Sequence, residues 1–183
     1  MSASSTRNPN SIATRVGDDG TTGLLYGQRV AKNHPQVDAV GTLDELNAAL
    51  GLAKATRPPG ADASAIERIQ RSLIALMGEI SCAESDLARY TQSKFAKLTE
   101  AELAEVDAAV AAIEARGPKF DGWATPGATI HAAALDLART AARRAERQLV
   151  GLPTHGKTVR PLILNYINRV SDLLWLMARE AEA

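Results

Sequence analysis

The spacing of apolar residues predicts helices over most of the chain after residue 36. In five segments apolar side chains recur at three- and four-residue steps, which keeps them on one face of an α-helix. The predicted helices cover residues 37–56, 63–88, 99–116, 130–150 and 159–181. Proline, glycine or polar residues mark the connections, and no segment shows a convincing strand or internal repeat. The pattern favours an all-α fold, a five-helix antiparallel-type bundle.

Residues 11–36 do not follow a helical pattern and predict an irregular loop. Glycine lets a backbone approach a ligand closely, and successive backbone N–H groups in such a loop can bind an anion. The loop also carries hydroxyl groups and cations, at Thr14, Thr21, Thr22, Arg15 and Lys32. It fits neither a Walker A loop nor a dinucleotide-binding fingerprint, and an ordinary surface loop is the alternative interpretation.

The fourth predicted helix carries a dense group of arginines between residues 139 and 147. At about 100° per residue, four charged side chains share roughly a third of the helix circumference and Arg144 lies at the edge. These four are Arg139, Arg143, Glu146 and Arg147. Stacked guanidinium groups bind phosphate oxygens through paired hydrogen bonds. A solvated face of a bundle helix has the same spacing, so the helix alone leaves both interpretations open.

Composition narrows the class of protein. Of the 183 residues 45% are hydrophobic but only 4% aromatic, which predicts a core of Ala, Leu, Ile and Val in one domain spanning residues 1–183. Twenty-one basic and 21 acidic residues give no net charge, which argues against general nucleic-acid binding. The single cysteine, Cys82, is expected to be a small buried hydrophobe in a reducing compartment.

No apolar run is long enough for a membrane span, and residues 1–10 are polar, so we expect a loose tail and a cytoplasmic protein. A di-metal site of the kind found in bundles is disfavoured, because none of His34, His131 and His155 lies three residues after a glutamate. Polyphosphate recognition by the glycine-rich loop and the arginine helix remains.

Four stretches of the chain match a known family in the same order. They are TRVGDDGTT at residues 14–22, VGTLDELN at 40–47, ALDLARTAARRAER at 134–147 and YINRVSDLL at 166–174. With them the sequence resembles the PduO-type ATP:cob(I)alamin (corrinoid) adenosyltransferases. The resemblance covers nearly the whole chain after residue 12, and the four stretches together are far more specific than any one alone.

The resemblance implies a homotrimer of five-helix bundles with ATP bound between neighbouring subunits. It also implies that magnesium is bound mainly by the ATP phosphates, and any protein ligand of the metal is unknown. It assigns nucleotide contacts to Thr14, Arg15, Val16, Gly17, Thr22, Gly23 and Lys32 in the loop, and to Arg143, Arg144, Glu146, Arg147 and Asn168 on the helices. It assigns the catalytic set to Arg143, Trp123, Asp44 and Arg139, with Arg139 and Asp44 forming an ion pair across the subunit boundary.

The implied reaction moves the 5′-deoxyadenosyl group of ATP to Co(I) of cobalamin and releases triphosphate. In the family an aromatic ring before the arginine helix covers the lower face of cobalt, and Trp123 stands at the matching place. The chain departs from the family pattern at Trp123, where Phe is usual, at Ala128, where a second glycine is usual, and at Asp136, where His is common. Packing or a subunit contact is the alternative role for Trp123.

Two other functions compete with this one. A non-catalytic trimer that senses or carries ATP and adenosylcobalamin would use the same binding residues and differ only in turnover. An RNA-binding helical protein would use the arginine helix, but zero net charge and interleaved acids argue against it. A reductase and an adenosylcobalamin-dependent enzyme are the expected partners, with no nucleic acid and no membrane.

Overall fold

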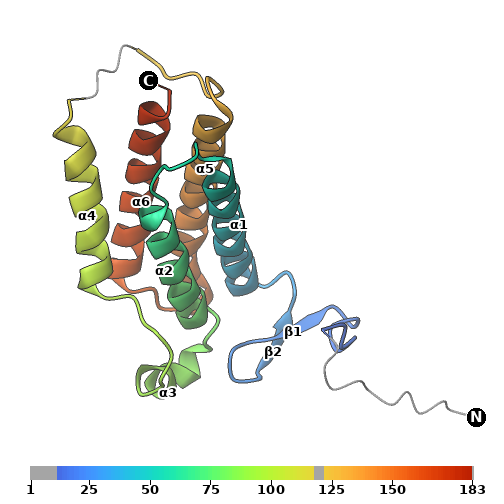
Figure 1. Cartoon of the computed structure of the whole chain (residues 1–183). Coiled ribbons are helices and arrows are strands. Elements are labelled where there is room, and N and C mark those ends of the chain that lie inside the picture. Colours follow the sequence, from blue (N-terminus) through green and yellow to red (C-terminus); the bar gives the residue numbers. More distant parts are fainter. Residues whose placement is uncertain (1–11, 118–121, 183) are drawn as a thin grey trace, which may run out of the picture.

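The structure is a computed structural model that describes residues 12–117 and 122–182. Five long helices form a bundle (Figure 1): α1 (Pro35–Thr56), α2 (Ser64–Ile80), α4 (Glu100–Glu114), α5 (Ile130–Gly151) and α6 (Pro161–Glu180). The predicted helical bundle is confirmed, and four of the five helices begin and end within two residues of the predicted positions. The predicted tail at residues 1–10 lies outside the described residues.

A short hairpin corrects the prediction that the chain contains no strand. Strand β1 (Thr21–Gly23) pairs antiparallel with β2 (Arg29–Ala31), and Thr22 lies opposite Val30. Strands of three residues are too short to show an alternating pattern, which explains why the sequence did not reveal them. The hairpin lies beside the start of α1 at the lower end of the bundle (Figure 1).

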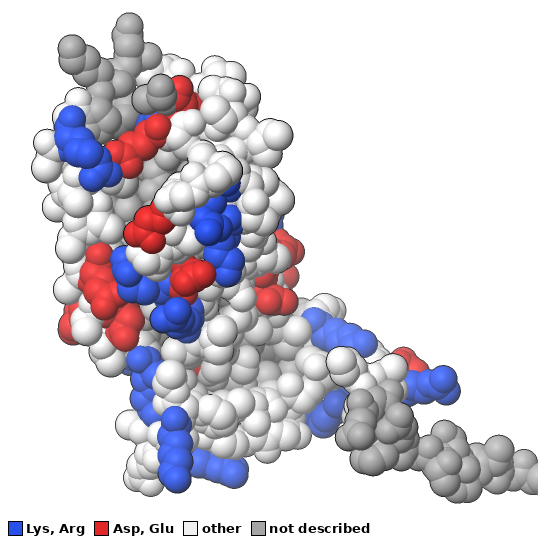
Figure 2. Space-filling model, viewed as in Figure 1, with Lys and Arg blue, Asp and Glu red and all other residues white. Residues whose placement is uncertain are grey.

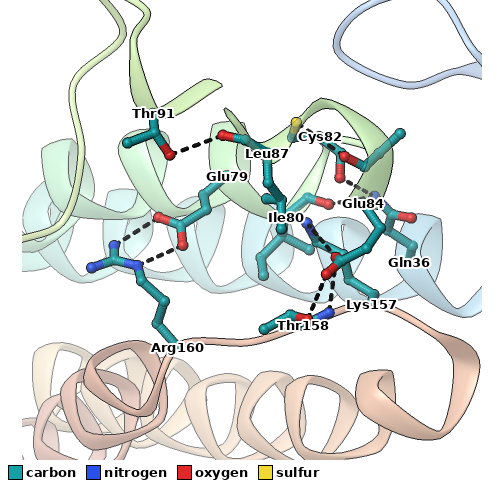
Figure 3. A network of polar contacts seen from close by, with 11 residues as sticks. Gln36, Glu79, Ile80, Cys82, Glu84, Leu87, Thr91, Lys157, Thr158 and Arg160 are labelled. Atoms are coloured by element: carbon teal, nitrogen blue, oxygen red, sulfur yellow. Dashed lines mark hydrogen bonds and ion pairs between the residues drawn. The ribbon is translucent and has the colours of Figure 1, made fainter. Parts of the chain in front are cut away.

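The predicted helix over residues 63–88 was wrong at its C-terminal end, because α2 stops at Ile80. The Gln36 amide donates to the carbonyl oxygens of Ile80, at 2.6 Å, and Cys82, at 2.9 Å (Figure 3). The backbone N–H of Leu25 donates to the carbonyl of Ser81 at 2.9 Å. These carbonyls accept from other parts of the chain, and the helix gives way to a 3₁₀ turn, η1 (Glu84–Asp86), and the five-residue helix α3 (Leu87–Thr91).

Helix α5 packs between α1 and α6 and runs antiparallel to both (Figure 1). Its inward face is built largely from alanines, namely Ala132, Ala134, Ala138, Ala141, Ala142 and Ala145. Such small side chains let neighbouring helices approach closely. Leucines and isoleucines of the other helices complete the core, as the composition predicted. Cys82, just after the end of α2, is also buried. Burial raises the pKa of its thiol.

Ion pairs tie the lower end of the bundle together (Figure 3). Arg160, just before α6, donates two hydrogen bonds of 2.7 Å to the Glu79 carboxylate on α2. Glu84 accepts from the backbone N–H of Thr158 at 3.0 Å and from its hydroxyl at 2.5 Å. A second 3₁₀ turn, η2 (Leu152–His155), links α5 to this region.

None of the described helices is long and apolar enough to cross a membrane.

Candidate functional site

The N-terminal loop is organised by Arg29, a residue that the sequence analysis did not single out. From β2 its guanidinium donates to the carbonyl of Val16 at 2.9 Å and to the hydroxyl of Thr21. Asp19 accepts from the hydroxyl of Thr21 at 2.7 Å and from its N–H at 2.9 Å, and these bonds lower the pKa of Asp19. An Asp two residues before Thr is the local signal for such a turn. Arg29 had no comparable signal, because its partners depend on the hairpin.

Two of the predicted nucleotide-binding residues, Gly17 and Lys32, lie against each other. A Cβ atom on Gly17 would stand 3.1 Å from Lys32 Cε, 3.2 Å from its Nζ and 3.0 Å from the carbonyl oxygen of Thr21. A side chain at residue 17 would therefore require the end of Lys32 or the loop backbone to move by a few tenths of an ångström. Arg15 has a φ angle of 57°, in the left-handed region that non-glycine residues rarely adopt. The loop thus holds an exposed ammonium group over a tightly turned backbone.

Charged residues of the predicted arginine face of α5 form contacts with both neighbouring helices, α1 and α6. Arg144 pairs with Glu45 of α1. Glu146 accepts a 3.1 Å hydrogen bond from Asn168 of α6. Arg143 and Arg147 are exposed between them, and one guanidinium N–H of Arg147 donates to the carbonyl of Arg143 at 3.0 Å. The structure therefore brings five predicted residues to one outward face, namely Arg143, Arg144, Glu146 and Arg147 of α5 and Asn168 of α6.

Arg139 lies on the same side of α5 but has a different partner from the one the resemblance implies. Its Nε donates to Asp136 at 2.9 Å within the helix. Asp44 is exposed on α1. A pair between Arg139 and Asp44 of a neighbouring subunit stays a prediction, because the structure holds one chain.

Trp123 lies at the other end of the bundle from the hairpin. Its side chain is fully exposed, at 101% of the reference area, in the loop at residues 122–129 that leads into α5. Figure 1 shows this loop at the top and the hairpin at the bottom. Lys32 lines a surface hollow with Gln148 and Gly151, so it lies near the C-terminal end of α5. Trp123, the arginine face and the N-terminal loop are therefore arranged in that order along α5, which is about 33 Å long.

Charge on the described surface is mixed. Figure 2 shows acidic and basic side chains interleaved over the bundle, while Lys and Arg predominate among the charged side chains near the hairpin and the lower end. A continuous positive surface of the kind that binds nucleic-acid backbones is not seen on this face. Local cation groups on an otherwise balanced surface suit a small anionic ligand better than a long polyanion.

The chain is similar to known proteins over most of its length. Residues 12–181 match the family model described as cobalamin adenosyltransferase. The corrinoid adenosyltransferase PduO of Citrobacter freundii is 42% identical over 171 residues, 92% of this chain but 49% of that protein. The corrinoid adenosyltransferase of Bacillus subtilis is 36% identical over 174 residues, covering 94% of this chain and 86% of that protein. The chain thus spans about half the length of the PduO relatives that it matches.

Solved structures show the same fold. A variant PduO-type ATP:corrinoid adenosyltransferase from Lactobacillus reuteri, complexed with cobalamin and ATP, superposes with a TM-score of 0.84 at 30% identity. The match covers 94% of this chain and 93% of that one. The family model spans nearly all of the described residues, and the alignments to the two relatives cover more than nine-tenths of the chain. This chain belongs to the cobalamin adenosyltransferase family.

Proposed function

We propose that this protein transfers the 5′-deoxyadenosyl group of ATP to the cobalt of a corrinoid, with release of triphosphate. The observation that carries the proposal is the order of groups along α5. An exposed aromatic ring stands at one end, an exposed arginine face in the middle and a glycine loop with Lys32 at the other. In a complex in which a corrinoid, the ribose of ATP and the triphosphate lie in line, the aromatic ring would contact the corrinoid. The arginine face and the glycine loop would contact the nucleotide and its phosphates.

The reaction is a displacement at carbon, and no protein side chain acts as its nucleophile. The electron pair of Co(I) forms the cobalt–carbon bond to C5′ while the C5′–oxygen bond breaks. Triphosphate leaves with the electron pair of that bond, and cobalt ends formally as Co(III). The protein therefore has to align cobalt, C5′ and the leaving oxygen and to stabilise the charge that develops on triphosphate.

Arg143 and Arg147 are placed to meet that charge. They are exposed, and Arg143 has no acidic partner among the ion pairs of the described residues. Lys32 and the turned backbone around Gly17 would hold the far end of the triphosphate, with contacts from Thr14, Arg15, Val16, Thr22 and Gly23. Asn168 and Glu146, already bonded to each other, would contact the nucleotide on the α6 side.

Magnesium would enter with ATP. The phosphate oxygens are ligands that Mg²⁺ prefers, and it usually needs few protein groups beside them. Among the described residues no group of three or more His, Cys, Asp or Glu could hold a metal ion. Magnesium bound mainly by phosphate is therefore part of the proposal, and no protein ligand is assigned to it.

The site is proposed to lie between subunits of a homotrimer. Ile130 and Leu137, seven residues apart on α5, are 77% and 53% exposed, and the proposal is that a neighbouring subunit covers them. Asp44 and Arg139 would pair across the boundary. Trp123 would lie under the lower face of cobalt, where an apolar ring excludes water and the axial base and makes Co(II) easier to reduce.

A turnover assay tests the proposal. The protein is incubated anaerobically with ATP, Mg²⁺ and chemically reduced cobalamin, and adenosylcobalamin absorbance and triphosphate are measured. Equal amounts of both products are expected. Binding of ATP and adenosylcobalamin without product would instead favour a non-catalytic sensor or carrier, the second candidate that the same contacts permit. A cytoplasmic location, a reductase that supplies Co(I) and an enzyme that accepts the product complete the proposal.

A further inference from the structure

A buried carboxylate, Asp136, lies on the arginine side of α5 with no role in the chemistry described above. At three and seven residues before Arg139 and Arg143 it shares their side of the helix. Yet it is only 4% exposed, because the C-terminal part of α6 covers it. Figure 1 shows this end of α6 beside the start of α5. A buried charge requires partners, and Asp136 has two.

The two carboxylate oxygens of Asp136 serve different arginines. Oδ1 accepts from Arg139 Nε at 2.9 Å, and Oδ2 accepts from Arg179 of α6. The Arg179 side chain is 6% exposed and also pairs with Glu182 at 3.0 Å. Of the two arginines bound to Asp136, Arg179 is enclosed and anchors the carboxylate. The Arg139 side chain is 24% exposed and can reach beyond the bundle.

We propose that Asp136 is a positioning residue that orients Arg139 toward the neighbouring subunit, with Arg179 fixing Asp136 in place. A guanidinium held at Nε keeps its two terminal nitrogens free as a fork for a second carboxylate. The inference rests on the proposed function, in which Asp44 of the next subunit is that carboxylate. It adds the group that decides where Arg139 points, which the resemblance does not supply.

Three single variants separate positioning from mere stability. Asp136→Asn removes the charge that holds Arg139. Arg179→Met removes the anchor of Asp136 but leaves its bond to Arg139, so the buried carboxylate keeps one cationic partner and the variant provides a second, independent test of the inference. Glu182→Gln is the matched control, because it removes the other partner of Arg179 and leaves Asp136 with both arginines.

The readout is the dissociation constant for Mg–ATP, measured by titration calorimetry, together with the melting temperature. We expect Asp136→Asn to weaken ATP binding about tenfold and Arg179→Met by a smaller factor, because an intersubunit site loses one oriented charge pair. Glu182→Gln lowers the melting temperature without changing ATP affinity. In an Asp44→Asn background, Asp136→Asn weakens ATP binding no further, because the partner of Arg139 is already lost.

Wild-type ATP affinity in both Asp136→Asn and Arg179→Met overturns the inference. So does a double variant in which the effects of Asp44→Asn and Asp136→Asn multiply. Binding does not depend on turnover, so these results are separate from the assay of the proposed function. A wild-type protein that binds ATP but makes no adenosylcobalamin would refute the proposed enzymatic function. The ATP affinities of the Asp44→Asn, Asp136→Asn and double variants would still decide whether Asp136 positions Arg139.

Discussion

The bidentate pair between Arg160 and Glu79 is expected to respond unequally to the loss of either partner. The Glu79 side chain is 11% exposed and that of Arg160 is 42% exposed. Arg160→Met leaves a buried carboxylate without its cation, a loss of about 3 kcal/mol at the lower end of the range for broken buried pairs. Glu79→Met leaves an arginine that water can solvate, so it costs only about 1 kcal/mol.

Urea unfolding followed by circular dichroism measures the difference at one protomer concentration, since oligomer stability depends on concentration. With a slope of about 2–3 kcal/mol per molar, Arg160→Met should lower the midpoint by roughly 1 M and Glu79→Met by roughly 0.4 M. Equal losses, or a larger loss for Glu79→Met, would refute the reasoning that burial decides the cost.

Three further changes test the candidate site. Arg143→Lys should lower kcat/KM about 10- to 100-fold, because a single ammonium cannot replace a two-pronged guanidinium on phosphate; near-normal steady-state turnover would count against its role. Trp123→Ala should leave the free energy of unfolding within about 0.5 kcal/mol of wild type, because the side chain is fully exposed. It should spare ATP binding but slow adenosylation that starts from Co(II)alamin, and normal rates from both Co(II) and Co(I) would remove Trp123 from the cobalt site. Gly17→Ala should weaken ATP binding severalfold in calorimetry by displacing Lys32, with unfolding nearly unchanged; wild-type affinity would show that the close contact is unimportant.

Local signals explain which parts of the fold the sequence could predict. The start of α4 is an example, because Thr99 caps the helix and the Glu102 carboxylate accepts from the Thr99 N–H at 2.8 Å. Both partners lie within four residues, so the pattern is visible in the chain. The end of α2 was missed because Gln36, 44 residues before Ile80, takes the carbonyls that would continue the helix. Apolar periodicity carries no information about such a bond.

The candidate site likewise contains residues that local spacing predicted and residues that it did not. Helical spacing placed Arg139, Arg143, Glu146 and Arg147 together, and the structure puts them on one side of α5. Only the resemblance to a family assigned Asn168 to the same site as Glu146, 22 residues before it, and the hydrogen bond between the two side chains was not predicted. Arg29 and Asp136 were not predicted, because their roles depend on a hairpin register and on the burial of one helix beneath the end of another.

The alanine interior of α5 has a consequence for how sequence variants of this protein should be interpreted. Ala138 and Ala142 are fully buried, on the side of the helix away from the arginines. A larger side chain there has no space and costs about 1–3 kcal/mol, unless the whole helix moves outward. Such movement carries the cationic side with it. Larger residues at Ala138 or Ala142 would therefore lower nucleotide affinity, although these buried positions do not contact the nucleotide. A genetic screen for nucleotide binding would wrongly assign them to the binding site.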